Sequence, residues 1–371
     1  MTLPSGKNPL PSPPEAHREE LAPPEKVDRF AVEDLWRGTL LALLVLAVFG
    51  AFALHVGHGA VALGWGETLD ILLGRSHAPQ QEAIIWQFRL PRAVTAAVAG
   101  SALAVAGLLM QTLFANPLAG PYVLGVDAGA SLGVALAVMG LEVLGPSWEA
   151  LSTVGSFTAA WIGAVLVLLG IFSVARHVRS GTVLLLVGIL FGFAANAVVS
   201  ILVALAPSEK VHGFLTWSMG SFAAAPWPRV RLLALGTLGG LGMAWGLAKS
   251  LDALLLGEDY AATMGVTPGA ARLRVLLATA LLAGSATACC GPVAFLGIAT
   301  PHLCRGLLRT EGHRWLLPAC AAAGGALALG ADALARLPGG LSLPLNAVLA
   351  LVGVPVVAWV LFRSAREGDR L

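Results

Sequence analysis

The chain has 371 residues, of which 57% are hydrophobic and only 12% are charged, with a mean hydropathy of +0.80 and a net charge of +2. Soluble proteins carry about 25% charged residues, so this composition excludes a soluble enzyme and a disordered protein. The small net charge gives no reason to expect a nucleic-acid partner.

The first 37 residues differ from the rest of the chain. They hold 12 of the 44 charged side chains and seven prolines, so they cannot bury enough apolar area to fold. This segment is also too long and too acidic for the first part of a signal peptide. We therefore predict a disordered cytoplasmic tail at 1–37, a transmembrane domain at 38–365 and a short cytoplasmic tail at 366–371.

Ten apolar segments follow the tail. A helix of about 20 residues crosses a bilayer core of about 30 Å, and most of these segments approach that length. They are continuously apolar, whereas barrel strands alternate between polar and apolar residues. We predict an all-α, polytopic membrane protein with about ten transmembrane helices, at 39–56, 93–113, 122–140, 154–175, 182–205, 231–247, 275–288, 291–301, 316–333 and 344–362. The short segments 275–288 and 291–301 predict tilted, broken or re-entrant helices.

Lysine and arginine indicate the orientation, because they gather in cytoplasmic loops. With ten spans and a cytoplasmic N-terminus, 16 of the 23 cations fall on the cytoplasmic side and seven on the other. This count predicts a multi-pass membrane protein with both termini in the cytoplasm. Arg89, Arg92 and Arg336 are among the outer cations, and they need a reason such as interfacial anchoring, an acidic partner within the chain or a partner protein.

Signatures of the common membrane enzymes are missing from the sequence. It has no G-x-x-x-x-G-K-[ST] phosphate loop and no H-E-x-x-H zinc motif. The one G-x-S-x-G match, at 129–133, lies inside an apolar segment and not at the strand-to-helix turn of a nucleophile elbow. The four cysteines lack the spacing of a disulfide framework or a zinc site, so we predict helix packing for them and no metal bound by the chain. Asp127 and Asp332 are the acids that stand out in the spans, and such scarcity disfavours ion-coupled transport.

Four sequence blocks occur in order along the apolar part. They are R-L-P-R at 89–92 with N-P-L-A at 116–119 and G-V-D-A-G-A at 125–130; L-G-E-D-Y-A at 256–261 with M-G-V at 264–266; G-P-V-A-F-L-G at 291–297 with P-H at 301–302; and A-D at 331–332 with L-P at 343–344 and G-V-P at 353–355. In order and spacing they resemble the permeases of type II ABC importers, the FecCD-type proteins that import iron-siderophores, haem and cobalamin. The resemblance covers about residues 38–365.

The second block lies in a long predicted cytoplasmic loop and forms a short amphipathic stretch between two glycines. The resemblance implies that it is the coupling helix, which docks in a groove of an ATPase subunit. The residues assigned to this contact are Leu256, Gly257, Glu258, Ala261, Gly265 and Val266. A helix that lies on the membrane surface is the alternative.

The resemblance also implies a role for the three outer arginines. Arg89, Arg92 and Arg336 would bind glutamates of a periplasmic or lipid-anchored substrate-binding protein, since a guanidinium group suits a carboxylate. Asp332 lies four residues before Arg336, so an intrahelical ion pair competes with docking. The basic loop that begins at His302 is interpreted as a lipid and orientation anchor.

Candidates for the pathway or its gate come from the same blocks. They are Asn116, Pro117, Asp127, Ser342, Pro344 and Asn346. Three of them depart from the family pattern, because Ser342 stands where a glutamate is common, Asn346 replaces a glycine and Asp127 replaces a small polar residue. A contact with a helix N-terminus, stabilised by the helix dipole, is the alternative role for Asp127.

Together these features predict a permease that catalyses no reaction and binds no cofactor. The resemblance implies that it works as a homodimer in the bacterial inner membrane. The resemblance implies two copies of an ABC ATPase subunit, which bind ATP and Mg, and a substrate-binding protein outside the membrane. An iron-siderophore is the first expected cargo, followed by cobalamin and haem. The rival function is an ion-coupled secondary transporter that acts without an ATPase partner.

Overall fold

A computed structural model describes residues 29–59, 61–75, 78–144, 155–175, 177, 181–223, 226–336 and 343–368. Within these ranges, each of the ten predicted spans corresponds to a helix. These helices are α1 (Arg29–Gly57), α4 (Leu90–Leu113), α5 (Val126–Leu144), α7 (Ser156–Ala175), α8 (Gly181–Leu205), α10 (Trp227–Gly246), α13 (Pro268–Cys290), α14 (Leu296–Leu308), α15 (His313–Ala335) and α16 (Leu345–Gly368). The predicted all-α fold class is confirmed.

Short helices connect the long ones. They are α2 (Trp65–Leu72), α3 (Pro79–Ala83), the π-helical turn η1 (Ile84–Arg89), the 3₁₀ turn η2 (Pro121–Leu124), α9 (Ser208–Ser218), α11 (Ala248–Leu254) and α12 (Glu258–Thr263). α3, η1 and α4 run on as a single helical stretch of 35 residues. α10 and α11 meet at a bend of 58°.

Length and hydropathy divide the long helices into two groups. Six helices of the described residues can cross a membrane on these grounds, and a seventh can if α10 and α11 count as one bent span. α14 has 13 residues, and α5 and α16 contribute the shorter apolar stretches Val126–Gly140 and Leu345–Ala358. The prediction of a short or broken helix is correct for 291–301 and wrong for 275–288, since α13 has 23 residues. Its first turns hold Arg272 and Arg274, which end the apolar run but not the helix.

Both predicted tail boundaries fall inside helices. α1 begins at Arg29, so residues 29–37 are helical, and Arg37 pairs with Glu33 and Asp34 on the preceding turn. These i, i+3 and i, i+4 pairs support a helix even in a charged segment. α16 likewise extends to Gly368, and residues 1–28 and 369–371 of the predicted tails lie outside the described residues.

α4 lies at the centre of the bundle, where it packs against α10, α13, α14 and α15. Small residues allow this close packing. A Cβ atom added to Gly107 would lie 1.7 Å from the carbonyl oxygen of Gly297, and one added to Gly100 would lie 2.3 Å from that of Gly324. Glycine at these positions brings α14 and α15 into backbone contact with α4, as small residues commonly do in membrane bundles.

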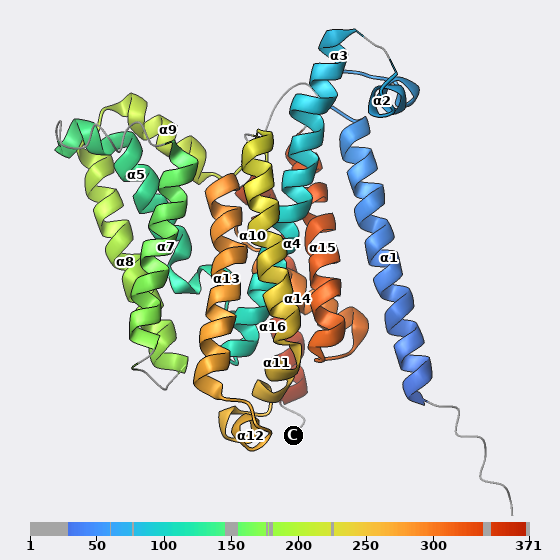
Figure 1. Ribbon diagram of the computed structural model, residues 1–371, viewed down its shortest axis with the longest axis vertical. Helices are drawn as coiled ribbons and strands as arrows, with labels where there is room; N and C mark the ends of the chain where they lie inside the picture. The colour runs from blue at the N-terminus through green and yellow to red at the C-terminus, as the bar shows by residue number, and fades with distance from the viewer. Residues whose placement is uncertain are drawn as a thin grey trace, which may run out of the picture.

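The bundle has two distinct ends (Figure 1). α2, α3 and α9 lie at one end, which is called the upper end here, and α11 and α12 lie at the other, the lower end. α1 begins at the lower end and runs along the side of the bundle to the upper end. The two ends carry the two groups of residues that the sequence assigns to partner proteins.

Candidate functional site

The three arginines assigned to docking come together at the upper end of α1, α4 and α15. The side chain of Asp332 on α15, which is 2% exposed, lies at the centre of this arginine cluster. Arg92 donates from Nε and Nη2 to its two carboxylate oxygens, at 2.7 and 2.8 Å. The Nε2 atom of His55 lies 2.6 Å from Oδ2, and the Nε atom of Arg336 lies 3.6 Å from it. One carboxylate therefore binds groups from three helices.

Arg89 has a different set of partners at the same end. Its guanidinium donates to the carbonyl oxygens of Val56 at 3.0 Å and Gly57 at 3.2 Å, and also to that of Val61. α1 ends at Gly57, and the last carbonyl groups of a helix have no partner within the helix. Because a cation is favourable at this negative end of the helix dipole, the buried Arg89 caps α1.

These contacts bear on the docking prediction without testing it. The structure shows an acidic partner within the chain for Arg92 and Arg336, which is the alternative that the sequence left open. The side chains of Arg92 and Arg336 keep 24% and 22% of their surface exposed, whereas Arg89 is buried. Docking to a binding protein stays a prediction, and the two partly exposed arginines are the better placed for it.

The predicted coupling segment lies at the lower end as a compact arm. α11, the loop at 255–257 and α12 form this coupling arm, and α12 is followed by a second turn before α13. Gly257 and Gly265 adopt φ angles of 101° and 84°, which glycine reaches without strain, so each allows the chain to reverse direction. Ala261 is buried, and Glu258 pairs with Arg272 of α13. The arm is thus held against the bundle.

Apolar side chains remain exposed on the coupling arm. Leu256, Tyr260 and Met264 are spaced four residues apart, and they are 64%, 52% and 60% exposed. Leu256 lies in the loop before α12, Tyr260 lies within this helix and Met264 lies at its end, and the rest of the described chain leaves all three side chains uncovered. This set of three is called the exposed apolar stripe here. An exposed apolar stripe at the end of a bundle suits a partner helix or groove better than water.

Two helices begin inside the bundle rather than at its ends. α5 follows the segment at 114–125, which contains only the 3₁₀ turn η2, and α14 follows the loop at 291–295. Tyr122 in the first segment uses its hydroxyl to donate to the carbonyl oxygen of Val293, at 2.9 Å, and to accept from its N–H, at 3.0 Å. A broken backbone within a membrane requires such partners, because lipid offers none.

Asn346 supplies the other partners of the loop at 291–295. Its Nδ2 donates to the carbonyl oxygen of Pro292 at 2.8 Å, and its Oδ1 accepts from the N–H of Ala294 at 2.9 Å. A glycine at position 346 would leave both backbone groups without these bonds. Asn346 was predicted as a pathway or gate residue, and the structure places it as the clamp that joins α16 to the start of α14.

The other gate candidates lie apart from one another. Asn116 accepts from the N–H of Leu118 at 2.9 Å, and the carbonyl oxygen of Pro117 lies 2.7 Å from Nε2 of His302. Asp127 lies in the first turn of α5, as the helix N-terminus alternative requires. Pro344 is exposed just before α16, and Ser342 lies outside the described residues. The structure thus connects Pro117 with α14 through His302, but it does not gather the candidates into one site.

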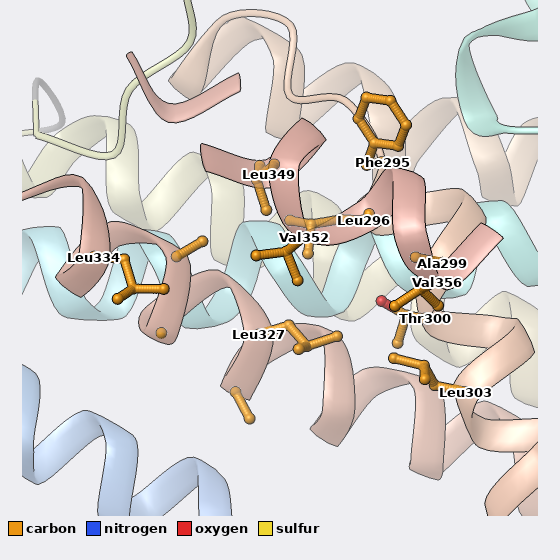
Figure 2. Close-up of a pocket in the computed structure, with 14 residues that line it drawn as sticks. Phe295, Leu296, Ala299, Thr300, Leu303, Leu327, Leu334, Leu349, Val352 and Val356 are labelled. Atoms are coloured by element: carbon orange, nitrogen blue, oxygen red, sulfur yellow. The ribbon is translucent and has the colours of Figure 1, made fainter. Parts of the chain in front are cut away.

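An apolar cavity lies between α14, α15 and α16 (Figure 2). Its volume is about 180 Å³, and Thr300 is the only side chain in its lining with a hydroxyl group. Leu303, Leu327, Leu334 and Val352 point into it (Figure 2). Pockets for drug-sized ligands have about 300–1,000 Å³, so this cavity is too small and too apolar to hold a metal chelate.

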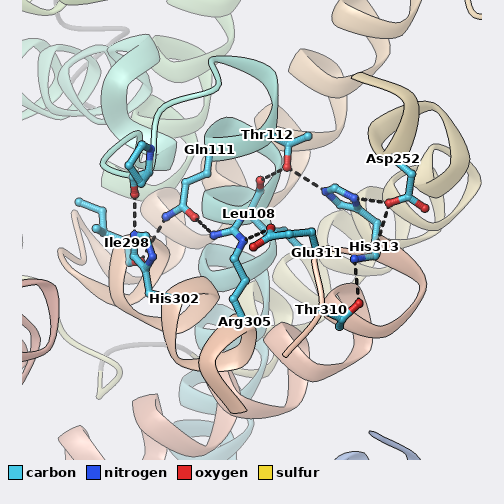
Figure 3. Close-up of polar contacts among 12 residues, drawn as sticks. Leu108, Gln111, Thr112, Asp252, Ile298, His302, Arg305, Thr310, Glu311 and His313 are labelled. Carbon is cyan, nitrogen blue, oxygen red and sulfur yellow. Dashed lines mark hydrogen bonds and ion pairs between the residues drawn. The ribbon is translucent and has the colours of Figure 1, made fainter. Parts of the chain in front are cut away.

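A polar network occupies the lower end of α4 (Figure 3). Arg305 donates to Gln111 at 2.5 Å and to Glu311 at 2.8 Å, and Gln111 donates to the carbonyl oxygen of Ile298. The interpretation of this segment as a lipid and orientation anchor is wrong for Arg305 and His302, whose side chains bind other parts of the chain. Charged loops next to a bundle look alike in sequence whether they face lipid headgroups or other helices.

His313 was part of the same anchor interpretation, and it is fully buried in this network. Its Nδ1 lies 2.7 Å from Oδ1 of Asp252 in α11, and its Nε2 lies 2.8 Å from the hydroxyl of Thr112 in α4. Sequence reasoning missed His55, Tyr122, Thr112 and Asp252. Each is a lone polar residue in or beside an apolar segment, and its partner is distant in the chain.

The fold and these sites define the class of protein. A bundle of apolar helices with two broken spans, a capped cationic upper end and an exposed arm at the lower end is the architecture of a polytopic membrane permease. The model of the FecCD transport family matches residues 43–363, and the chain belongs to this family.

Curated relatives cover nearly the whole chain. The hemin transport system permease HmuU of Yersinia pestis is 34% identical over 335 residues, which are 90% of this chain and 97% of the relative. The vitamin B12 import system permease BtuC of Klebsiella pneumoniae is 36% identical over 289 residues, which are 77% of this chain and 85% of the relative. These relatives and the apolar helices indicate a multi-pass inner-membrane protein.

One solved structure has the same fold along the whole bundle. It is described as an inward-facing conformation of a metal-chelate type ABC transporter, and it aligns with a TM-score of 0.76 at 27% identity. The alignment covers 88% of this chain and 99% of the solved chain. The chain therefore has the fold of a membrane subunit of a type II ABC importer.

Proposed function

We propose that the chain is the permease subunit of an ATP-driven importer of metal chelates. The observation that carries this proposal is the match to the haemin permease over 97% of that relative's length. The exposed apolar stripe at the lower end supports it, because a transporter that acts without an ATPase subunit has no use for such a surface. The ion-coupled alternative also lacks support from the spans, where the described acids are bound to partners or lie at a helix start.

Two copies of the chain form the transport pathway between them in this proposal. The cavity between α14, α15 and α16 has a volume of about 180 Å³, which is too small for a bulky chelate, so the proposal places the path at a dimer interface. Two ATPase subunits bind ATP and Mg at the lower end, which faces the cytoplasm together with both termini. ATP binding and hydrolysis in these partners move the coupling arms, and the permease itself catalyses no reaction.

The upper end receives a substrate-binding protein, periplasmic or lipid-anchored. Arg92 and Arg336 share one carboxylate and Arg89 binds carbonyl oxygens at the same end, so the cluster keeps an excess of positive charge that attracts acidic side chains. Arg336 is the residue to test, because its contact with Asp332 is the longest in the cluster. Arg336→Gln should weaken capture of the binding protein at low salt without lowering the unfolding temperature of the permease.

The cargo in this proposal is a metal chelate. The named relatives transport haemin or vitamin B12, which places haem and cobalamin ahead of the iron-siderophore that the sequence blocks put first. All three are bulky and carry a metal within an organic framework. In this proposal the choice among them rests with the binding protein.

The experiment is uptake into proteoliposomes that contain the permease with its ATPase subunits. Haemin, cobalamin and a ferric siderophore are tested in separate samples, each supplied together with the binding protein. ATP is present on the side of the membrane that carries the ATPase subunits, and no ion gradient is applied. Uptake of one cargo that stops without ATP is expected. Uptake driven by a proton or sodium gradient in the absence of ATPase subunits would overturn the proposal and establish the secondary transporter.

A further inference from the structure

Asp252, His313 and Thr112 form a continuous chain of hydrogen bonds from the coupling arm to the centre of the bundle. Asp252 lies in α11, His313 is the first residue of α15 and Thr112 lies in the last turn of α4. Figure 3 shows the imidazole ring between the carboxylate and the hydroxyl. The three side chains thus connect three helices that are distant in the sequence.

Asp252 holds His313 at two points. Its Oδ1 accepts from the backbone N–H of His313 at 2.8 Å and binds the ring Nδ1 at 2.7 Å. The first N–H groups of a helix lack partners within it, and a carboxylate there is also favoured by the helix dipole. One carboxylate on the coupling arm therefore caps α15 and orients the first side chain of that helix.

Thr112 completes the connection on the other side of the ring. Its hydroxyl lies 2.8 Å from Nε2 of His313 and 3.0 Å from the carbonyl oxygen of Leu108. His313 is fully buried and Thr112 is 4% exposed, so no substrate reaches either group. An acid, an imidazole and a hydroxyl in a row are also the elements of a hydrolase site, but the hydroxyl that would act as the nucleophile is buried, which excludes that use here.

We propose that Asp252, His313 and Thr112 are positioning residues that transmit movement of the coupling arm to α4 and α15. α11 packs against α4 and α15 in addition to α12, so the chain of hydrogen bonds lies along an existing contact. The imidazole and the hydroxyl are buried, whereas the Asp252 side chain is 42% exposed. Because all three groups form directional bonds, the arm cannot shift without moving α15 or breaking the bonds. This inference rests on the proposed function, because it requires a partner that moves the arm.

Without these bonds the arm would still bind the ATPase subunit, since the exposed stripe at Leu256, Tyr260 and Met264 is separate from Asp252. ATP hydrolysis would then continue while less of its movement reaches the pathway. The measurable consequence is a fall in the number of substrate molecules imported per ATP hydrolysed. A residue with a purely structural role would lower both rates together.

The test measures uptake and ATP hydrolysis in the same proteoliposomes for Thr112→Val, Thr112→Ser and Asp252→Asn. Thr112→Val removes the hydroxyl without changing the shape, and Thr112→Ser keeps the hydroxyl. We expect Thr112→Val to import about tenfold less substrate per ATP, within the roughly 5–150-fold range typical of coupling between sites. Thr112→Ser should restore the wild-type ratio, and Asp252→Asn should fall between the two because its amide oxygen still accepts one bond.

The matched control is Thr279→Val. Thr279 is a fully buried threonine of α13, and its hydroxyl has no hydrogen-bond partner among the described residues. The Thr279→Val variant should keep the wild-type ratio of substrate imported to ATP hydrolysed. An unchanged ratio in both Thr112→Val and Asp252→Asn overturns the inference, and so does a loss in Thr112→Val that Thr112→Ser fails to restore.

The wild-type protein separates this inference from the proposed function. If wild-type proteoliposomes show no ATP-dependent uptake of any tested chelate, the proposed function fails before any variant is compared. If wild-type uptake depends on ATP and the variants keep the same ratio, only the role of the three residues is refuted.

Discussion

Replacing Asp332 by asparagine tests how strongly the arginine cluster holds the upper end together. The carboxylate receives two hydrogen bonds from Arg92, at 2.7 and 2.8 Å, and lies 2.6 Å from Nε2 of His55. Asp332→Asn keeps the shape but leaves Arg92 and Arg336 without a counter-charge. Their mutual repulsion then acts at a site where Asp332 itself is only 2% exposed.

Removal of one partner from a buried ion pair costs about 3–5 kcal/mol. Since the arginine side chains keep 24% and 22% of their surface in contact with solvent, we expect the lower limit, about 3 kcal/mol. For chains of 150–250 residues each kcal/mol lowers the unfolding temperature by about 2–4 °C, and the effect shrinks in larger chains. The expected fall is therefore roughly 5 °C.

The four buried cysteines provide the assay. Cys289, Cys290, Cys304 and Cys320 are all buried and free, so a thiol-reactive dye reports unfolding in detergent as they become exposed. Asp70→Asn is the matched control, because Asp70 pairs with Arg75 at 2.5 Å where the two side chains are 36% and 69% exposed. An exposed pair contributes about 1 kcal/mol or less. Equal unfolding temperatures for Asp332→Asn and Asp70→Asn would refute this account of the cluster.

Three further predictions concern the broken spans, the helix packing and the coupling arm. Asn346→Gly removes two hydrogen bonds of about 1 kcal/mol each. Amide hydrogen exchange in the loop before α14, measured by mass spectrometry, should therefore accelerate about tenfold or more. An unchanged exchange rate would contradict the role of Asn346 as a clamp on this loop. Gly107→Leu should lower the unfolding temperature severely, because a Cβ atom would lie 1.7 Å from a carbonyl oxygen of α14, whereas Gly246→Leu, with open space around it, should not. Met264→Asp should weaken ATPase-subunit binding at least tenfold in a titration, while Leu69→Asp at the opposite end should leave it unchanged.

Sequence alone was sufficient for the class of fold and for most helices. Apolar segments of about 20 residues have few alternatives in a membrane, since the backbone must satisfy its own hydrogen bonds. The glycines at 257 and 265 indicated a turn–helix–turn in the same way, because positive φ angles favour glycine. The helix ends differ from the prediction. α1 begins at Arg29 and α16 ends at Gly368, because both helices continue through charged segments beyond the apolar core.

Only the tertiary structure decided what the polar side chains do. His55 and Asp332 are 277 residues apart, and His313 and Thr112 are 201 residues apart, so no local sequence pattern predicts either contact. The role of Asn346 follows from the same limit, because its partners belong to a loop that α16 meets only after the bundle has formed. The length and order of apolar segments determine which helices form, whereas the packing of those helices determines which buried polar group finds which partner.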